Sequence, residues 1–134
     1  MAPYNSPPLG FGQISVITKL KASYQLWQSV IQHVPKLHRH TFGGKIDELF
    51  LKTLEILFRA QYTKTEVKSQ YLVAAIGKLD LLKFFLQIGW ENKLVDTKKY
   101  INLSEALEEI GRMLGGWKKG LETKLSPHNG REKQ

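Results

Sequence analysis

Four stretches of this chain repeat apolar residues at intervals of three and four, which places those residues on one face of a helix. The most regular repeat is the last, with intervals 4-3-4-3-4 through Leu103, Leu107, Ile110, Leu114, Trp117 and Leu121. A heptad-like seam of this kind suits helices that pack side by side at shallow angles. No stretch shows the sustained two-residue alternation of a strand bounded by hairpin turns. The pattern predicts an all-α fold, an antiparallel up-and-down four-helix bundle.

Proline, glycine and polar residues divide the chain into three parts. Residues 1–13 hold several prolines and glycines, which predicts an irregular N-terminal lead. Residues 14–125 contain the four amphipathic stretches and are expected to form the bundle. Residues 126–134 are polar and are expected to form a flexible tail. A chain of 134 residues suffices for one such domain.

Turn-forming residues predict where the helices end. Pro35 ends the first helix, because proline disfavours the helical conformation of the residue before it and has no N–H to donate. Residues 35–40 are then expected to form a short basic loop, with Thr41 as a candidate cap of the second helix. The third helix is expected from about Thr65 to Asn92.

The composition limits the chemistry and the partners. Lysine and arginine number 20 against 12 acidic residues, so the net charge is +8, and residues 1–45 contain no acid. This excess favours anionic partners such as nucleic acid or an acidic protein surface, although it could serve solubility alone. The absence of cysteine excludes a disulfide, a thiolate zinc site and a cysteine nucleophile, and fits a cytoplasmic location. No apolar run is long enough to span a membrane, and the N-terminus lacks the pattern of a secretory signal.

Catalytic and metal-binding patterns are weak. His33, His38 and His40 lie close together but lack a recognisable ligand spacing, and no HExxH motif is present. The acids of the last helix are expected to form a solvated face and not an acid–base pair. Gly43-Gly44-Lys45 lacks the rest of a phosphate loop. We therefore expect no catalytic residue, no metal and no cofactor.

The last helix leaves two questions open. Asn102 or Ser104 is its candidate cap or first residue, with the alternative that Tyr100 and Ile101 already belong to the helix. Its second half contains four glycines, each costing about 1 kcal/mol relative to alanine in a helix interior. The glycines are Gly111, Gly115, Gly116 and Gly120. They indicate either close approach of a neighbouring helix or an end of the helix near Gly115.

Aromatic and basic residues interleave in the first helix. Tyr24 and Trp27 follow Lys19 and Lys21, an arrangement that could stack unpaired bases. Both aromatic residues also lie on the apolar face of the helix. We expect them to belong to the core.

A glycine and tryptophan segment in the last helix resembles the C-terminal signature of a known family. The segment reads Glu109-Ile110-Gly111-Arg112-Met113-Leu114-Gly115-Gly116-Trp117-Lys118-Lys119. It is similar to that of the accessory variability determinant (Avd) proteins of diversity-generating retroelements. Pro35-Lys36 with Arg39 and Phe42-Gly43, Tyr24 to Trp27, and Leu81-Leu82 also resemble this family, so the resemblance spans about residues 20–121.

The resemblance implies a fold and a function. It implies a four-helix bundle that assembles into a basic, barrel-like homopentamer. It also implies binding to the retroelement reverse transcriptase and to nucleic acid, both template RNA and DNA, in support of mutagenic complementary-DNA synthesis. The protein itself would have no catalytic role. Four-helix proteins encoded in ribosomal-RNA intervening sequences share the fold and are one alternative.

Two sets of residues are the candidate sites. Those expected to bind nucleic acid or the enzyme are Lys36, His38, Arg39, His40, Lys45, Arg112, Lys118 and Lys119. Those expected to pack helices or subunits are Gly111, Leu114, Gly115, Gly116 and Trp117. The sequence also leaves open a module that binds protein only and a bundle nuclease, although no helix carries the arginine and histidine spacing of a bundle nuclease.

Overall fold

The computed structural model describes the backbone of residues 11–125 and the side chains of residues 16–123. Helices make up most of this part of the chain, and it contains no strand. The elements in chain order are α1 (Phe11–Ile31), α2 (Lys36–His38), the π-helix η2 (Arg39–Gly43), α3 (Gly44–Gln61), α4 (Thr65–Glu91) and α5 (Thr97–Leu125).

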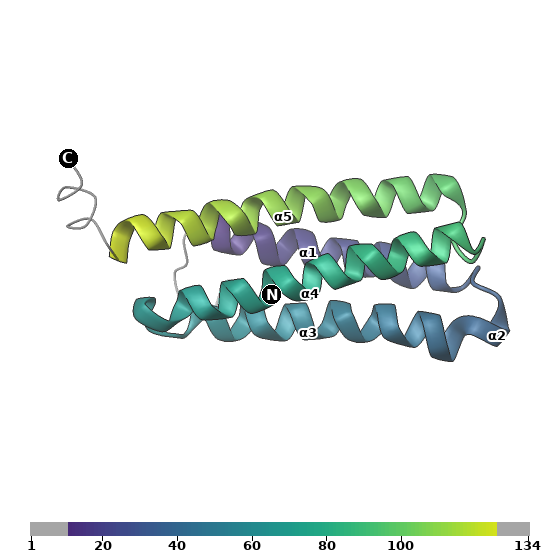
Figure 1. Cartoon of the computed structure of the whole chain (residues 1–134), viewed down its shortest axis with the longest axis horizontal. Coiled ribbons are helices and arrows are strands. Elements are labelled where there is room, and N and C mark those ends of the chain that lie inside the picture. Colours follow the sequence, from purple (N-terminus) through teal and green to yellow (C-terminus); the bar gives the residue numbers. More distant parts are fainter. Residues whose placement is uncertain (1–10, 126–134) are drawn as a thin grey trace, which may run out of the picture.

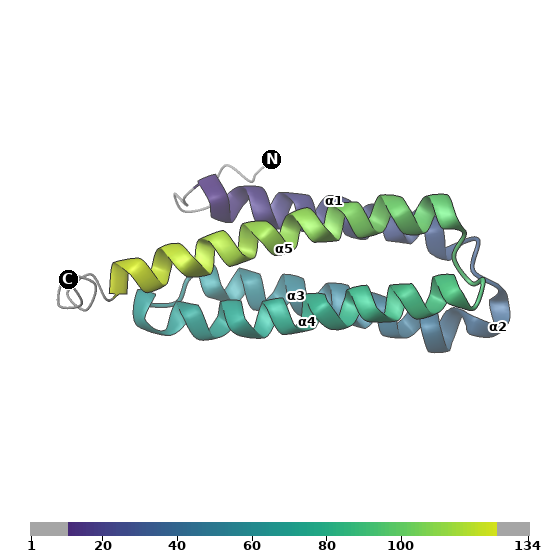
Figure 2. The same ribbon diagram turned by 45° about the horizontal axis from the view of Figure 1, so that its top comes forward.

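The four long helices lie side by side and alternate in direction along the chain (Figure 1, Figure 2). Helices α1 and α4 each pack against both α3 and α5, so the four helices close into a ring of neighbours. Each neighbouring pair is antiparallel, because every connection reverses the direction of the chain. The prediction of an antiparallel up-and-down four-helix bundle is confirmed.

The apolar faces of the four helices meet in one core. The seam predicted on α5 is confirmed, because all of its residues are buried except Trp117, which is half-buried. The largest fully buried side chains are Trp27 of α1 and Phe50 of α3. The interval of three and four in the sequence therefore identified most of the face that each helix buries, although Phe58, Val67 and Ala74 follow the same interval and are exposed.

Tyr24 and Trp27 belong to the interior of the bundle, as expected. Trp27 is fully buried, and its ring meets that of Phe42 edge-on at a centroid distance of 6.1 Å. The hydroxyl of half-buried Tyr24 donates a hydrogen bond of 2.6 Å to the Asp47 carboxylate. This hydrogen bond, together with burial, raises the pKa of the Tyr24 hydroxyl above its ordinary value. Both contacts join α1 to the segment that runs from η2 into α3.

The predicted loop at residues 35–40 is wrong, because Lys36 and the residues after it are helical up to α3. Thr41 does not cap α3 either: its hydroxyl donates to the carbonyl of His38 at 3.4 Å, and α3 begins at Gly44. A π-helical turn accommodates one residue more than an α-helical turn. In η2 this turn directs the ring of Phe42 into the bundle, where it contacts Trp27. A segment of five residues is too short for its periodicity to reveal such a contact.

The helix ends differ from the prediction at two places. Helix α1 begins at Phe11, inside the stretch 1–13 that was expected to be irregular, whereas residues 1–10 and the expected tail 126–134 lie outside the described residues. Helix α4 ends at Glu91 with Asn92 as its C-terminal cap, in agreement with the predicted end near Asn92. The cap of α5 is Asp96, whose carboxylate accepts the N–H of Lys99 at 2.9 Å.

The capping candidates Asn102 and Ser104 are therefore wrong, because both lie inside α5. The helix also continues through all four of its glycines to Leu125, so the alternative of an end near Gly115 is wrong. A Cβ at Gly111 would make an ordinary contact of 3.5 Å with Leu79 of α4.

The expectation of close approach within the bundle fails for the other three glycines of α5. A Cβ atom would meet nothing within 4 Å at Gly115, Gly116 or Gly120. The close approach occurs instead at Gly89 of α4, where a Cβ would overlap the ring of Phe42. Gly89 therefore provides the space that the ring of Phe42 fills.

Two glycines of the same helix give opposite predictions for alanine. Gly89→Ala should lower the free energy of unfolding by about 1–3 kcal/mol, because the ring of Phe42 must move to admit the methyl group. Gly77→Ala should raise it by about 0.5–1 kcal/mol, because nothing lies within 4 Å of its Cβ and alanine favours the helix. Urea unfolding measures both, and equal effects of the two substitutions would contradict the contact.

Candidate nucleic-acid and partner-binding surface

The predicted binding residues lie at two separate places on the bundle. Those from Lys36 to Lys45 lie where α2 and η2 connect α1 to α3, whereas Lys118 and Lys119 lie toward the opposite end, on the last turns of α5 (Figure 1). Arg112 lies between them, on an exposed position of α5. The structure therefore does not gather these residues into a single site.

Arg39 has a structural role that the sequence did not indicate. Its Nε donates to the carbonyl of Val34 at 2.8 Å, and its Nη2 donates to the carbonyl of Gln32 at 2.9 Å. These carbonyls follow the end of α1, where backbone acceptors lack helical partners and the helix dipole favours a positive charge. The Arg39 guanidinium thus holds the end of α1 against η2.

Two further candidates are already paired with acidic side chains. The Lys45 ammonium lies 3.7 Å from Glu48 and 5.6 Å from the centre of the Phe85 ring. The Lys118 ammonium lies 2.6 Å from Glu122. Such exposed pairs contribute little to stability and can exchange their partner for a phosphate.

The remaining candidates are available to a ligand. Among the described residues, Lys36, Arg112 and Lys119 take part in no ion pair. Near Lys36, His40 is exposed and His38 is half-buried. Fewer of the predicted binding residues are therefore charged and without an ion pair in the described residues than the sequence suggested.

The α4–α5 turn adds cations that the sequence did not single out. The antiparallel topology places this turn at the same end as α2, so Lys93 and Lys98 join Lys36 there (Figure 1). Their side chains form no ion pair within the described range, whereas Lys99 lies 3.6 Å from Asp96. Residues more than fifty positions apart in the sequence thus meet at one basic end. Counting charges along the sequence does not reveal this basic end, because it depends on the direction in which each helix runs.

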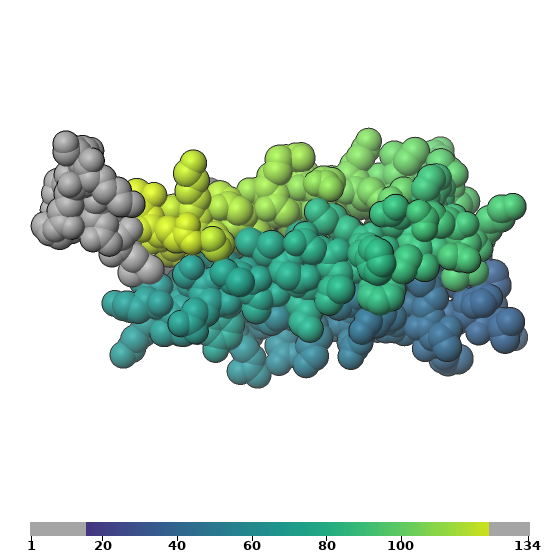
Figure 3. Space-filling model, viewed as in Figure 1, coloured from purple at the N-terminus to yellow at the C-terminus, as the bar shows by residue number. Residues whose placement is uncertain are grey.

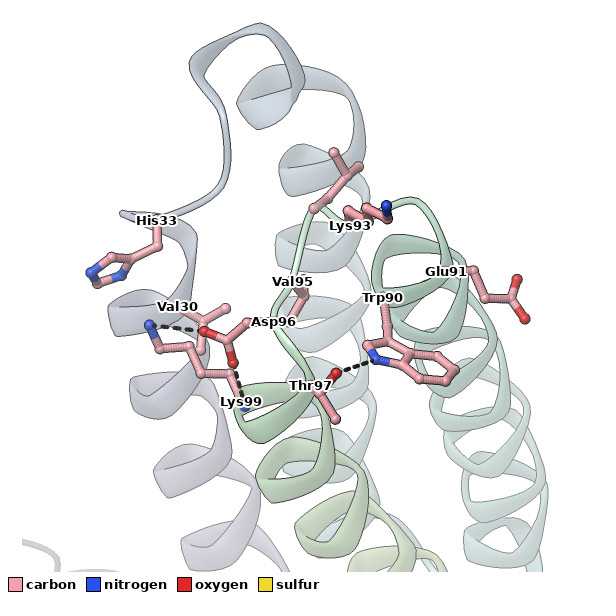
Figure 4. A pocket seen from close by; sticks show the side chains of 10 residues that line it. Val30, His33, Trp90, Glu91, Lys93, Val95, Asp96, Thr97 and Lys99 are labelled. Carbon is pink, nitrogen blue, oxygen red and sulfur yellow. Dashed lines mark hydrogen bonds and ion pairs between the residues drawn. The ribbon is translucent and has the colours of Figure 1, made fainter.

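A pocket opens at this basic end. It lies between the end of α1, the end of α4 and the α4–α5 turn, and has a volume of about 590 Å³ (Figure 4). Trp90 lines it, with its Nε1 donating to the Thr97 hydroxyl at 3.0 Å. The backbone N–H of Lys99 and then the charge of Lys99 hold the pKa of the Asp96 carboxyl below its ordinary value. No group of three histidine, cysteine or acidic side chains in the described residues could hold a metal ion.

Apolar side chains are exposed on the outer faces of two helices. The ring of Phe58 on α3 lies 5.2 Å from that of Tyr62, the residue that follows this helix, and the two are 59% and 53% exposed. On α4 the exposed apolar residues include Val73, Leu81 and Phe84. Figure 3 shows the face of the molecule on which α4 lies beside α5. Exposed aromatic residues of this kind are typical of protein contact surfaces.

The comparison with known families decides the classification. The sequence model of a family described as bAvd-like matches residues 15–121, which reach from the first turns of α1 to the last turns of α5. The chain belongs to the bAvd-like family. The match confirms the resemblance to Avd proteins that the sequence shows. Proteins of this family are of an accessory, non-catalytic kind. No curated protein matches the chain. None of the helices in the described residues is both long enough and apolar enough to cross a membrane.

The capping role of Arg39 predicts different effects for two neighbouring cations. Arg39→Ala should lower the free energy of unfolding by about 1–2 kcal/mol, because two carbonyls lose charged hydrogen-bond donors. Lys36→Ala should change it by less than about 0.5 kcal/mol, because its side chain is exposed and unpaired. Urea unfolding of the two variants tests this, and equal stability of both would refute the capping role.

Proposed function

We propose that this protein is the accessory factor of a diversity-generating retroelement. It binds the reverse transcriptase of the element and its nucleic acid, and so supports mutagenic reverse transcription. The observation that carries the proposal is the bAvd-like match, which extends over nearly the whole bundle. The protein has no catalytic role in this function.

The distribution of charge supports nucleic-acid binding. Most acidic side chains of the described residues already contact a lysine or an arginine: Glu48, Glu55, Asp80, Asp96, Glu108, Glu109 and Glu122. The cations without an acidic partner there are Lys21, Lys36, Arg39, Lys52, Lys64, Lys68, Lys78, Lys93, Lys98, Arg112 and Lys119. They occur on all four long helices or the connections between them. When such cations bind phosphates, counterions are displaced from the nucleic acid, and their release favours binding. The protein thus acts as an electrostatic scaffold for the nucleic acid.

Assembly into a homopentamer is the second part of the proposal. A groove of about 530 Å³ runs between α4 and α5 and is lined by Val73, Ile76, Gly115 and Lys118. Gly115 and the adjacent Gly116 leave the surface of α5 without side chains, and nothing lies within 4 Å of either Cβ position. A helix of a second copy can therefore approach this part of α5 closely. Assembly also multiplies the charge of each subunit.

Co-purification tests the binding proposal. The protein is expressed beside a candidate reverse transcriptase and its template RNA, and we expect it to retain both. Affinity for the RNA should fall steeply as salt rises, because counterion release dominates the free energy. Affinity that stays flat from low to moderate salt would contradict the electrostatic scaffold. Retention of the enzyme without any RNA or DNA binding would favour a module that binds protein only, and RNA cleavage that survives purification would favour a nuclease.

Light scattering tests the assembly proposal. At micromolar concentration the protein should show the mass of a pentamer, and Gly115→Leu should reduce this mass because the new side chain fills the space for the second copy. The variant should keep its helical circular dichroism, since its Cβ meets no neighbour in the chain. Lys52→Leu adds the same side chain to an exposed position of α3 and should leave the pentamer intact. A monomeric mass for the unmodified protein would refute the assembly.

A further inference from the structure

The pocket at the basic end, termed the turn pocket, is lined by Val30, His33, Trp90, Lys93, Asp96 and Lys99 among others (Figure 4). Its volume of about 590 Å³ lies within the range of pockets that bind small ligands. None of these residues was predicted to bind a ligand from the sequence. The turn pocket therefore adds residues to those that the sequence assigned to nucleic-acid binding.

A preformed stack of two aromatic rings borders the turn pocket. The rings of Trp90 and Tyr100 lie 4.9 Å apart with an angle of only 6° between their planes. The hydrogen bond from Trp90 Nε1 to Thr97 fixes the rotation of the indole. Trp90 remains 37% exposed although Tyr100 covers it on one side. The exposed part of the indole is therefore available to stack a planar ligand.

Lys93 adds a cation whose backbone is held in an unfavourable conformation. Its φ of 63° is left-handed, and it is the one non-glycine residue of the described range with positive φ. Its N–H donates to the carbonyl of Trp90 at 3.0 Å, and the N–H of Leu94 donates to the carbonyl of Gly89 at 2.8 Å. This is the glycine-favouring end of a helix, and a lysine there costs energy that a glycine would not. A strained residue beside a pocket indicates a role for its side chain.

Two acidic residues, Asp96 and Glu91, also line the turn pocket. The Asp96 carboxylate is occupied by the backbone N–H and the ammonium of Lys99. The Glu91 carboxylate keeps its negative charge and accepts a hydrogen bond from the Gln87 amide, and in Figure 4 it is directed outward from the other labelled side chains. Lys93 is a cation of the pocket without an ion pair in the described residues, and it lines the pocket together with the partly exposed Trp90.

We infer that the turn pocket binds one unpaired nucleotide of a single-stranded nucleic acid. The base stacks on Trp90, and the phosphate contacts Lys93. In a duplex both faces of each base are covered by its neighbours, so only an unpaired base can add to the Trp90 stack. This inference rests on the nucleic-acid part of the proposed function, and it adds a site and a preference for single strands.

Binding of a labelled uridine homopolymer to the full-length protein tests the stacking. Trp90→Leu should weaken it about tenfold, the effect of losing one stacked base. Phe84→Leu is the matched control, because Phe84 is an exposed aromatic residue of the same helix outside the pocket, and it should leave the affinity unchanged. A duplex RNA of the same length should bind both variants as it binds the unmodified protein. Addition of the homopolymer should also quench tryptophan emission, and this quenching should be lost in Trp90→Leu.

Lys93→Gly separates the role in binding from the role in the fold. It should raise the melting temperature, because glycine adopts the left-handed conformation freely, and yet it should weaken binding of the homopolymer. Lys64→Gly removes one charge at the connection of α3 to α4, at the opposite end of the bundle, and should weaken binding less. A variant that is more stable but binds less cannot owe its loss to misfolding.

The outcomes distinguish this inference from the proposed function. If the unmodified protein binds no nucleic acid, the nucleic-acid part of the proposed function fails and the inference fails with it. If it binds, but Trp90→Leu and Lys93→Gly behave as their controls do, the turn pocket is overturned while the proposed function stands. Loss of the reverse transcriptase in Trp90→Leu with unchanged RNA binding would also overturn the inference, because the pocket would then hold a protein side chain.

Discussion

The contact between Phe42 and Gly89 positions one whole end of the bundle. The ring of Phe42 occupies the place where any Cβ at position 89 would lie, and it meets Trp27 of α1 edge-on. Three segments that are distant in the sequence, α1, η2 and α4, are thereby held at fixed positions. The carbonyl of Gly89 also accepts the hydrogen bond from Leu94 that ends α4. The α4–α5 turn, and with it Trp90 and Lys93, therefore depends on this packing.

The electrostatics of the surface follow from the same arrangement. Antiparallel packing brings acids of α5 next to lysines of α1 and α4, as in the pairs of Glu109 with Lys19 and of Glu108 with Lys83. Such exposed pairs stabilise the bundle only slightly, but they neutralise many of its acids. In the described residues, much of the positive charge is consequently carried by lysines and arginines without an acidic partner. A small bundle with this surface is suited to hold polyanions and does not need an active site to do so.

The sequence predicted the elements with a strong period better than it predicted their connections. The seam of α5 and the extent of α4 agree with the structure, because burial of one face imposes the interval of three and four along a long helix. The segment from Lys36 to Phe42 is too short to show a period, so its helical conformation was missed. The candidate site was predicted less well: Arg39 caps α1, and Lys93 of the turn was not considered. Hydrogen bonds and neighbours of this kind depend on residues far away in the sequence.

By itself, the sequence determined the all-α class, the buried face of each helix and the positive charge, since these follow from local periodicity and composition. It also contained the glycine and tryptophan segment that indicated the family. Only the tertiary structure decided which glycine admits a neighbouring ring, which cations remain unpaired and which connections share one end of the bundle. Those properties require the direction and the neighbours of every helix, and they arise when the four apolar faces pack against one another.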